Sequence, residues 1–168
     1  MQILIIRHAI AEERAEFAAT GKSDDQRPLT GEGRRKMTEA AAGLRALVSH
    51  LDVIAASPLV RAQQTAAIVA KAYGIADVET TPTLEPDAEL ASFAKWALQH
   101  ARHDAVAAVG HEPHLGTLVT WLLSGRADSH VAFKKGGACL IECDGAPGPA
   151  TGRLLWHLTP SMLRRMAE

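Results

Sequence analysis

The sequence predicts an α/β fold: a single domain over residues 1–168 in three layers, with a mostly parallel central sheet flanked by helices. Three short apolar runs, at residues 2–6, 52–56 and 106–109, each lead toward a segment whose apolar residues recur at helical spacing. Such alternation is typical of a sheet covered on both faces. A chain of 168 residues, 47% of them hydrophobic, is long enough for one sizeable core and too short for two domains of ordinary size.

The first unit begins with residues 2–6, an uninterrupted apolar run rich in isoleucine that is typical of a central strand. A polar stretch follows at residues 12–27. The hydroxyl of Thr30 then favours the start of a helix. The apolar face of this helix is predicted to consist of Met37, Ala41, Leu44, Val48 and Leu51. We expect this face to pack on the sheet.

The next two units repeat the order of strand, loop and helix. Residues 52–56 form a run that stops at Ser57 and Pro58, and the helix after it ends at Gly74. Residues 106–109 form a short buried strand that leads through residues 110–113 into another helix. Between these units, residues 88–100 are expected to form a more peripheral helix.

The last part of the chain predicts an antiparallel hairpin at a sheet edge. Its strands, at residues 138–143 and 153–157, are separated by the turn-forming stretch 144–152. Both cysteines, Cys139 and Cys143, lie on the first of these strands, where they do not have the geometry of a disulfide. Free thiols of this kind are typical of a reducing compartment.

Composition and charge argue against several classes of partner. The net charge of -1 provides no extended field that attracts nucleic acid or an acidic membrane. An aromatic content of 4% disfavours base-stacking platforms. The first apolar run is too short for a membrane span, and Arg7 and His8 interrupt it where a signal peptide needs its apolar centre. We therefore expect a cytoplasmic protein with no nucleic-acid or membrane partner.

Polar side chains follow three of the predicted strands. Arg7 and His8 end the first, Arg61 lies shortly after the second, and His111 follows the third. Strand ends of this kind meet at the edge of an α/β sheet where ligands bind. Guanidiniums grip phosphoryl oxygens as rigid forks, and an imidazole attacks phosphorus. The set predicts phosphoryl transfer.

Four motifs resemble those of the histidine phosphatases: RHA at residues 7–9, LTGEG at 29–33, SPLVRAQQTA at 57–66 and VGH at 109–111. Their order and their spread over most of the chain are far more specific than any one motif. The resemblance implies a phosphoglycerate mutase-like fold. The small size of the chain and RPLT at residues 27–30 resemble the SixA-type branch, the phosphohistidine phosphatases.

The resemblance implies a role for each matched residue. His8 is the nucleophile, Arg7 and Arg61 hold the phosphoryl oxygens, and His111 completes the pocket. Guanidiniums beside the nucleophile disfavour its protonated form and so lower its pKa, and they also stabilise charge in the transition state. The implied reaction is a double displacement through a phosphohistidine on His8, with no metal or other cofactor.

Two further positions qualify this pattern. Arg27 is implied as an additional phosphate contact, and pairing with Asp24 or Asp25 on the surface is its alternative. Ala9 stands where the commoner family motif has glycine. Its methyl group is tolerable if the backbone there is not at positive φ.

The proton donor decides the expected substrate. Relatives that cleave phosphate esters carry an acid in a long insertion, whereas this chain has a short segment in which Glu85 is the candidate acid and substrate contact. A phosphoramidate needs less help, because its P–N bond is labile once the imidazole is protonated. A short segment also leaves the site open. We therefore expect a phosphohistidine-bearing protein as partner, a component of a phosphorelay or phosphotransferase system.

Two other functions stay open at this point. With Glu85 as a working acid, the chain is a broad-specificity phosphatase for small phosphate monoesters. A phospho-binding module without turnover is the alternative outside the enzymes, although a pure binder gains little from His8. A metal site is not expected, because the histidine pairs lack the HExxH spacing. These pairs are His100 with His103 and His111 with His114.

Overall fold

Six strands form one sheet in the order β3-β2-β4-β1-β5-β6 in the computed structural model, which describes residues 1–167. The parallel strands are β1 (Gln2–Arg7), β2 (Val53–Ala56), β3 (Glu79–Thr80) and β4 (Ala105–Gly110). The antiparallel strands are β5 (Ala138–Cys143) and β6 (Gly152–Leu158). The predicted sheet, mostly parallel with an antiparallel hairpin at one edge, is confirmed.

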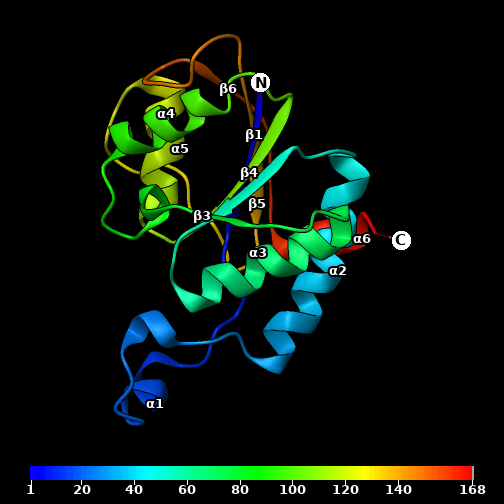
Figure 1. Cartoon of the computed structure of the whole chain (residues 1–168), viewed down its shortest axis with the longest axis vertical. Coiled ribbons are helices and arrows are strands. Elements are labelled where there is room, and N and C mark those ends of the chain that lie inside the picture. Colours follow the sequence, from blue (N-terminus) through cyan, green and yellow to red (C-terminus); the bar gives the residue numbers. More distant parts are fainter. Residues whose placement is uncertain (168) are drawn as a thin grey trace.

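Helices cover both faces of this sheet (Figure 1). One face carries α2 (Gly31–Leu47), α3 (Val60–Tyr73) and α6 (Pro160–Arg165), and the other carries α4 (Leu90–Gln99) and α5 (His114–Ser124). Successive side chains of β1 pack alternately against the two helix layers. Leu4 and Ile6 belong to the apolar cluster of α2 and α3, whereas Ile3 and Ile5 belong to that of α4 and α5. Burial on both sides explains why this strand is apolar throughout.

Two expectations about helices need correction, and a polar stretch for which no element was predicted contains two short helices. The helix that Thr30 caps ends at Leu47, so Val48 and Leu51 are not part of it. Both residues lie after the end of the helix and still bury their side chains in the core. Buried residues in a loop can have the same spacing along the sequence as the apolar residues of one more helical turn. The polar stretch 12–27 contains α1 (Arg14–Ala18) and a 3-10 helix (Asp24–Gln26). The helix expected to be peripheral, α4, buries Phe93 and Trp96.

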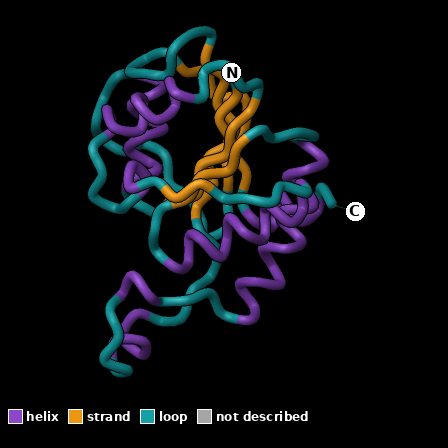
Figure 2. The backbone as a smooth tube through the Cα atoms, viewed as in Figure 1, coloured by secondary structure: helices purple, strands orange, loops and turns teal. Residues whose placement is uncertain are grey.

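The loops after β1, β2 and β4 meet at the carboxyl end of the sheet. Figure 2 shows the segment between β1 and α2 extending beyond this end. Strands β1 and β4 are neighbours, with Arg7 opposite Gly110, yet α2 and α5, which follow them along the chain, cover opposite faces. A crevice forms at the carboxyl ends of two neighbouring strands when the connections after them lead to opposite faces of the sheet. This crevice is the usual ligand site of such sheets.

The start of α2 lies directly against the chain that leaves β1. The hydroxyl of Thr30 accepts a hydrogen bond from the Gly33 N–H at 2.9 Å, as an N-cap does. A Cβ on Gly33 would lie only 2.0 Å from the carbonyl oxygen of Ile10. Gly33, the second glycine of the LTGEG motif, therefore allows α2 to approach Ile10, two residues after His8.

Two further observations concern the environment of the chain. Cys139 and Cys143 are free, buried thiols on β5. Within residues 1–167, no helix combines the length and the apolar character needed to cross a membrane.

Candidate active site

Five of the six residues selected from the sequence line one cavity of about 340 Å³ at the carboxyl ends of β1 and β4. Arg7 and His8 come from the end of β1, Arg61 from the first turn of α3, and His111 from the loop after β4. Arg27 lies between the 3-10 helix and α2. These three guanidiniums and two imidazoles thus come from four separate segments, and Arg14 adds a fourth guanidinium to the cavity.

His8 is buried, and its ring is held by its own main chain. Its Nδ1 lies 2.7 Å from the carbonyl oxygen of Ala9. Because a carbonyl only accepts, Nδ1 carries the proton and donates it, which leaves the lone pair on Nε2. The Ala9 N–H donates in turn to the hydroxyl of Thr65 at 3.0 Å. His8 therefore presents a fixed nucleophilic nitrogen, Nε2.

The alanine at position 9 causes no backbone strain. Within residues 1–167, the only residue other than glycine with a positive φ is Ala150. The backbone of Ala9 is therefore not at positive φ, and the methyl group next to His8 is tolerated.

Burial lowers the pKa of His8 to about 3, and the positive charges of Arg61, Arg7 and Arg27 act in the same direction. The hydrogen bond to Ala9 opposes this shift. The imidazole is therefore neutral at pH 7, as a nucleophile must be. The sequence predicted this direction from the guanidiniums alone, whereas the main cause in the folded protein is burial.

Arg7 and Arg61 are held by main-chain carbonyls and keep donors available. Nη1 of Arg7 donates to the carbonyl of Phe133 at 2.5 Å, and Nη1 of Arg61 donates to that of Asp24 at 2.9 Å. The Nε atoms of both arginines are buried and have no hydrogen-bond partner among residues 1–167. Buried donors without acceptors are rare in folded proteins. An oxyanion in the cavity is the acceptor that suits them.

Asp24 joins Arg27 and Arg61. Its Oδ1 accepts a hydrogen bond from Nε of Arg27 at 2.8 Å, and its Oδ2 lies 3.2 Å from Nη2 of Arg61. Arg27 also donates to the carbonyl of Glu12 at 2.7 Å and is buried. Arg27 thus pairs with Asp24 and lines the cavity at the same time. The predicted pairing with Asp24 is present, but the Arg27 side chain is buried in the cavity and does not lie on the surface.

His111 lies beside His8, with the ring centroids 5.1 Å apart. Its Nε2 is 2.9 Å from the hydroxyl of Ser57, which is fully buried at the end of β2. Burial lowers the pKa of His111 to about 2, and His8 and Arg61 add to the shift. Ser57 is the first residue of the SPLVRAQQTA motif, but no role for it is predicted from the sequence. Its contact with His111 depends on β2 and β4 being neighbours.

Glu85 does not line the cavity. The turn that carries it presents the next residue, Pro86, instead. The Glu85 N–H donates to the carbonyl of Pro82 at 3.1 Å within this turn. The expectation that Glu85 is the acid or a substrate contact is therefore not supported by its position.

Three carboxylates that the sequence analysis did not select line the cavity: Glu12, Glu13 and Glu112. The oxygens of Glu112 accept hydrogen bonds from the Gly116 N–H at 3.2 Å and from the Phe133 N–H at 2.6 Å. Glu112 thus fixes the loop whose carbonyl holds Arg7. Glu12 and Glu13 are exposed on the segment that extends beyond the sheet. Nothing in the sequence distinguishes them from other polar residues of that stretch.

No three histidine, cysteine, aspartate or glutamate side chains within residues 1–167 gather closely enough to hold a metal ion. The pairs His100 with His103 and His111 with His114 therefore have no third such side chain among the described residues close enough to complete a metal site.

The buried imidazoles of His8 and His111 predict a loss of stability on mild acidification. In the folded chain the pKa of His8 is about 3 and that of His111 about 2, whereas an unfolded histidine titrates at about 6.5. Below that pH the unfolded chain binds protons that the folded chain does not, so the free energy of unfolding falls as the pH falls. Between pH 7 and pH 5 we expect each histidine to contribute a loss of about 2 kcal/mol, measured by urea unfolding.

The variant His8→Gln isolates one of these contributions. It is expected to lose about 2 kcal/mol less than the wild type between pH 7 and pH 5. Ser124→Ala, which changes no titratable group, is the control and is expected to lose as much as the wild type. An equal loss in the wild type and in His8→Gln contradicts the assignment.

The arrangement suits attack on a tetrahedral anion. Guanidinium donors hold its oxygens, and the unprotonated Nε2 of His8 is available for its central atom. The cationic side chains stabilise the charge that spreads over the oxygens during transfer.

Comparison with known proteins agrees with this geometry. Residues 3–86 match the family model described as histidine phosphatase superfamily (branch 1). An uncharacterized protein of Picosynechococcus sp. is 35% identical over 139 residues, which are 82% of each chain. The phosphohistidine phosphatase SixA of Escherichia coli is 28% identical over 167 residues, 98% of this chain and 97% of SixA.

A solved structure of the protein histidine phosphatase SixA in complex with tungstate has the same fold. It superposes with a TM-score of 0.82 at 24% identity and covers 97% of this chain and 99% of its own. The family model alone spans half of the chain and includes the segments that carry Arg7, His8, Arg27 and Arg61. The chain therefore belongs to the histidine phosphatase superfamily, whose members are phosphatases.

Proposed function

We propose that this phosphatase hydrolyses phosphohistidine in proteins, through a phosphohistidine formed on its own His8. The observation that carries the proposal is the unprotonated Nε2 of His8 in a cavity that four guanidiniums line. A module that only binds phosphate needs the guanidiniums and gains nothing from such a nitrogen. Turnover is therefore the better account of the site.

The reaction has two displacements. Nε2 of His8 attacks the phosphorus and the P–N bond of the substrate breaks. The substrate imidazole leaves as the neutral ring, because its other nitrogen already carries a proton in the phosphohistidine. Water then attacks the phosphorus of phosphorylated His8, releases inorganic phosphate and restores the neutral imidazole. Arg7, Arg27 and Arg61 stabilise the charge on the oxygens in both steps. Neither step assigns a role to a metal ion.

The carboxylates favour a phosphoramidate over an alkyl ester as substrate. Glu85 lies away from the cavity, and both oxygens of Glu112 are engaged with main-chain N–H groups. Glu12 and Glu13 line the cavity but are exposed, so neither is buried beside the leaving group as a placed acid. An alkoxide leaving group needs a placed acid, whereas a protonated imidazole leaves readily. The similarity to SixA, named as a phosphohistidine phosphatase, supports the same choice, and tungstate in the related complex is a tetrahedral oxyanion like phosphate.

The partner proposed on this basis is a phosphorylated protein, a component of a phosphorelay or phosphotransferase system. Of the short segment around Glu85, only Pro86 lines the cavity, so this segment does not enclose a bound phosphorylated loop. The exposed carboxylates Glu12 and Glu13 stand at the rim that a protein substrate meets first.

The test compares four substrates with the wild-type protein: phosphohistidine proteins, phosphoramidate, an aryl phosphate and an alkyl phosphate. We expect phosphohistidine and phosphoramidate to be cleaved and the alkyl phosphate to resist. Glu85→Gln is expected to leave every rate unchanged. Fast cleavage of the alkyl phosphate that Glu85→Gln abolishes, together with resistance of every phosphohistidine protein, overturns the proposal in favour of a broad-specificity ester phosphatase.

Ser57 is expected to act through His111. Ser57→Ala removes the hydroxyl 2.9 Å from His111 Nε2, which frees the imidazole to turn. We expect kcat/KM for phosphoramidate to fall about ten-fold, which corresponds to about 1.4 kcal/mol. Ser124→Ala removes a hydroxyl that bonds within α5 and serves as the matched control. Equal rates for the two variants contradict a role for Ser57.

A further inference from the structure

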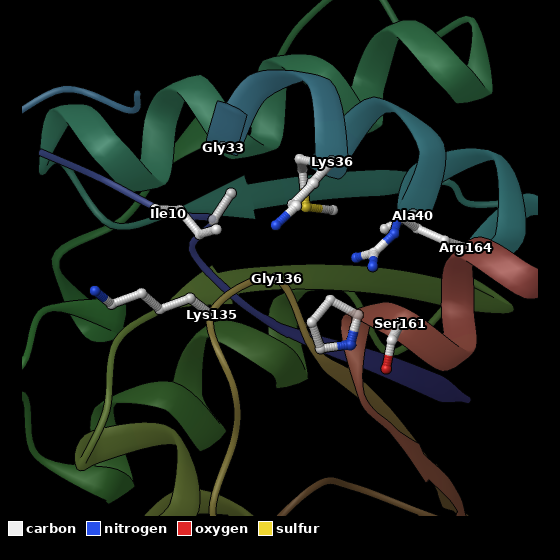
Figure 3. Close-up of a pocket in the computed structure, with 11 residues that line it drawn as sticks. Ile10, Gly33, Lys36, Ala40, Lys135, Gly136, Ser161 and Arg164 are labelled. Atoms are coloured by element: carbon white, nitrogen blue, oxygen red, sulfur yellow. The ribbon is translucent and has the colours of Figure 1, made fainter. Parts of the chain in front are cut away.

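A second, smaller cavity lies between α2, α6 and the turn before β5 (Figure 3). Its volume is about 180 Å³. Apolar side chains form part of its wall, among them Ile10, Met37 and Pro160. Three cationic residues line it as well: Lys36, Lys135 and Arg164. No acidic residue lines this cavity, so its wall is apolar in part and positively charged.

The cavity adjoins the active site. Ala9, which lines it, is the residue after His8, and Lys135 lines both cavities. The Gly136 N–H donates to the carbonyl of His8 at 3.1 Å, so the wall of the smaller cavity is bonded to the nucleophile segment. When a phosphoryl group is bound at His8, other groups of the same substrate molecule can therefore reach this cavity.

The charges come from two helices. Figure 3 shows Lys36 reaching into the cavity from α2 and Arg164 from α6. Each has one carboxylate partner on α2: Lys36 lies 2.5 Å from Glu32, and Nε of Arg164 lies 3.6 Å from Glu39. Lys135 forms no ion pair within residues 1–167. The cavity thus keeps cationic charge for an incoming anion.

The size and chemistry of the cavity define its occupant. A volume of about 180 Å³ is below the roughly 300–1,000 Å³ of ordinary small-molecule sites. It suits a single side chain with methylene groups for the apolar wall and a carboxylate for the cations. We propose that it binds a glutamate side chain of the same phosphoprotein whose phosphohistidine enters the active site. This inference rests on the proposed function and adds a determinant of sequence preference to it.

The test uses phosphohistidine peptides in an alanine background, with one glutamate moved from four residues before the phosphohistidine to four residues after it. We expect glutamate at one position, or at two adjacent ones, to raise kcat/KM roughly five-fold, the range of a partly exposed ion pair. Lysine at the same position is expected to give no gain.

Charge reversal of the cavity gives the sharper result. In the double variant Lys36→Glu, Arg164→Glu, we expect the preference for glutamate to disappear and lysine to become the favoured residue at that position. The rate with phosphoramidate, which is too small to reach this cavity, is expected to stay within about two-fold. The matched control is Arg34→Glu with Arg165→Glu, which changes exposed arginines of the same two helices and is expected to keep the preference.

The outcomes separate the two proposals. If glutamate raises the rate at no position, or if its effect survives charge reversal, the glutamate site is wrong and the proposed function stands. If the wild type cleaves no phosphohistidine peptide, the proposed function is wrong, and the same scan is made with phosphotyrosine peptides. If the wild type prefers glutamate in the phosphotyrosine peptides and the charge-reversed variant does not, the glutamate site is supported independently of the proposed function. The lack of such a preference there overturns it.

Discussion

Replacement of His8 by alanine is expected to lower kcat/KM for phosphoramidate by at least about 10⁴-fold, as loss of a nucleophile does in other enzymes with covalent intermediates. The reason is specific to one atom. Nδ1 of His8 is bonded to the carbonyl of Ala9, so Nε2 carries the only lone pair of this ring, and alanine removes it. The activity that remains is due to the guanidiniums, which still position the anion and water. The measurement is the initial rate of phosphate release.

The control for His8→Ala is His130→Ala, which removes an exposed histidine side chain. It is expected to keep the wild-type rate. Wild type treated with labelled phosphoramidate is expected to yield an acid-labile phosphoenzyme that His8→Ala does not form. Inorganic phosphate is expected to raise the Tm of both proteins, which shows that the variant is folded with an intact anion site. Full hydrolytic activity in a folded His8→Ala protein removes the proposed mechanism.

Arg61→Lys is expected to lower kcat/KM by about 10²- to 10³-fold although the charge is kept. Arg61 is buried and donates to the carbonyl of Asp24 through Nη1, while its Nη2 pairs with the carboxylate of the same residue. Its buried Nε is one of the donors available to an oxyanion. A lysine ammonium is a single point charge and does not reach both Asp24 and the anion. The measurement is kcat/KM with phosphoramidate, together with the affinity for inorganic phosphate.

Arg34→Lys is the matched control, because Arg34 is exposed on α2. It is expected to change neither the rate nor the affinity for phosphate. Urea unfolding of Arg61→Lys at pH 7 separates a local effect from a loss of the fold. A folded Arg61→Lys protein with a rate within two-fold of the wild type excludes Arg61 from the phosphate contacts.

The fold follows from local patterns that the sequence states directly. The apolar run of β1 predicts a strand covered on both faces, and Gly74, at a φ of 70°, ends α3 where the sequence predicts. The pattern fails at Val48 and Leu51, which are buried as loop residues. Apolar spacing reports burial, and burial does not require that the backbone is helical.

The sequence by itself determined the sheet class, the family resemblance and the identity of five cavity residues. It succeeded there because strand ends carry their polar residues to one edge of a parallel sheet. The tertiary structure decided the rest: that Nε2 of His8 holds the lone pair, that Ser57 contacts His111, and that Pro86 replaces Glu85 at the cavity. These facts depend on side-chain directions and on contacts between segments distant in the chain. A single sequence carries no record of the Ser57–His111 contact, which arises only when β2 and β4 lie side by side, nor of the direction in which the His8 ring turns.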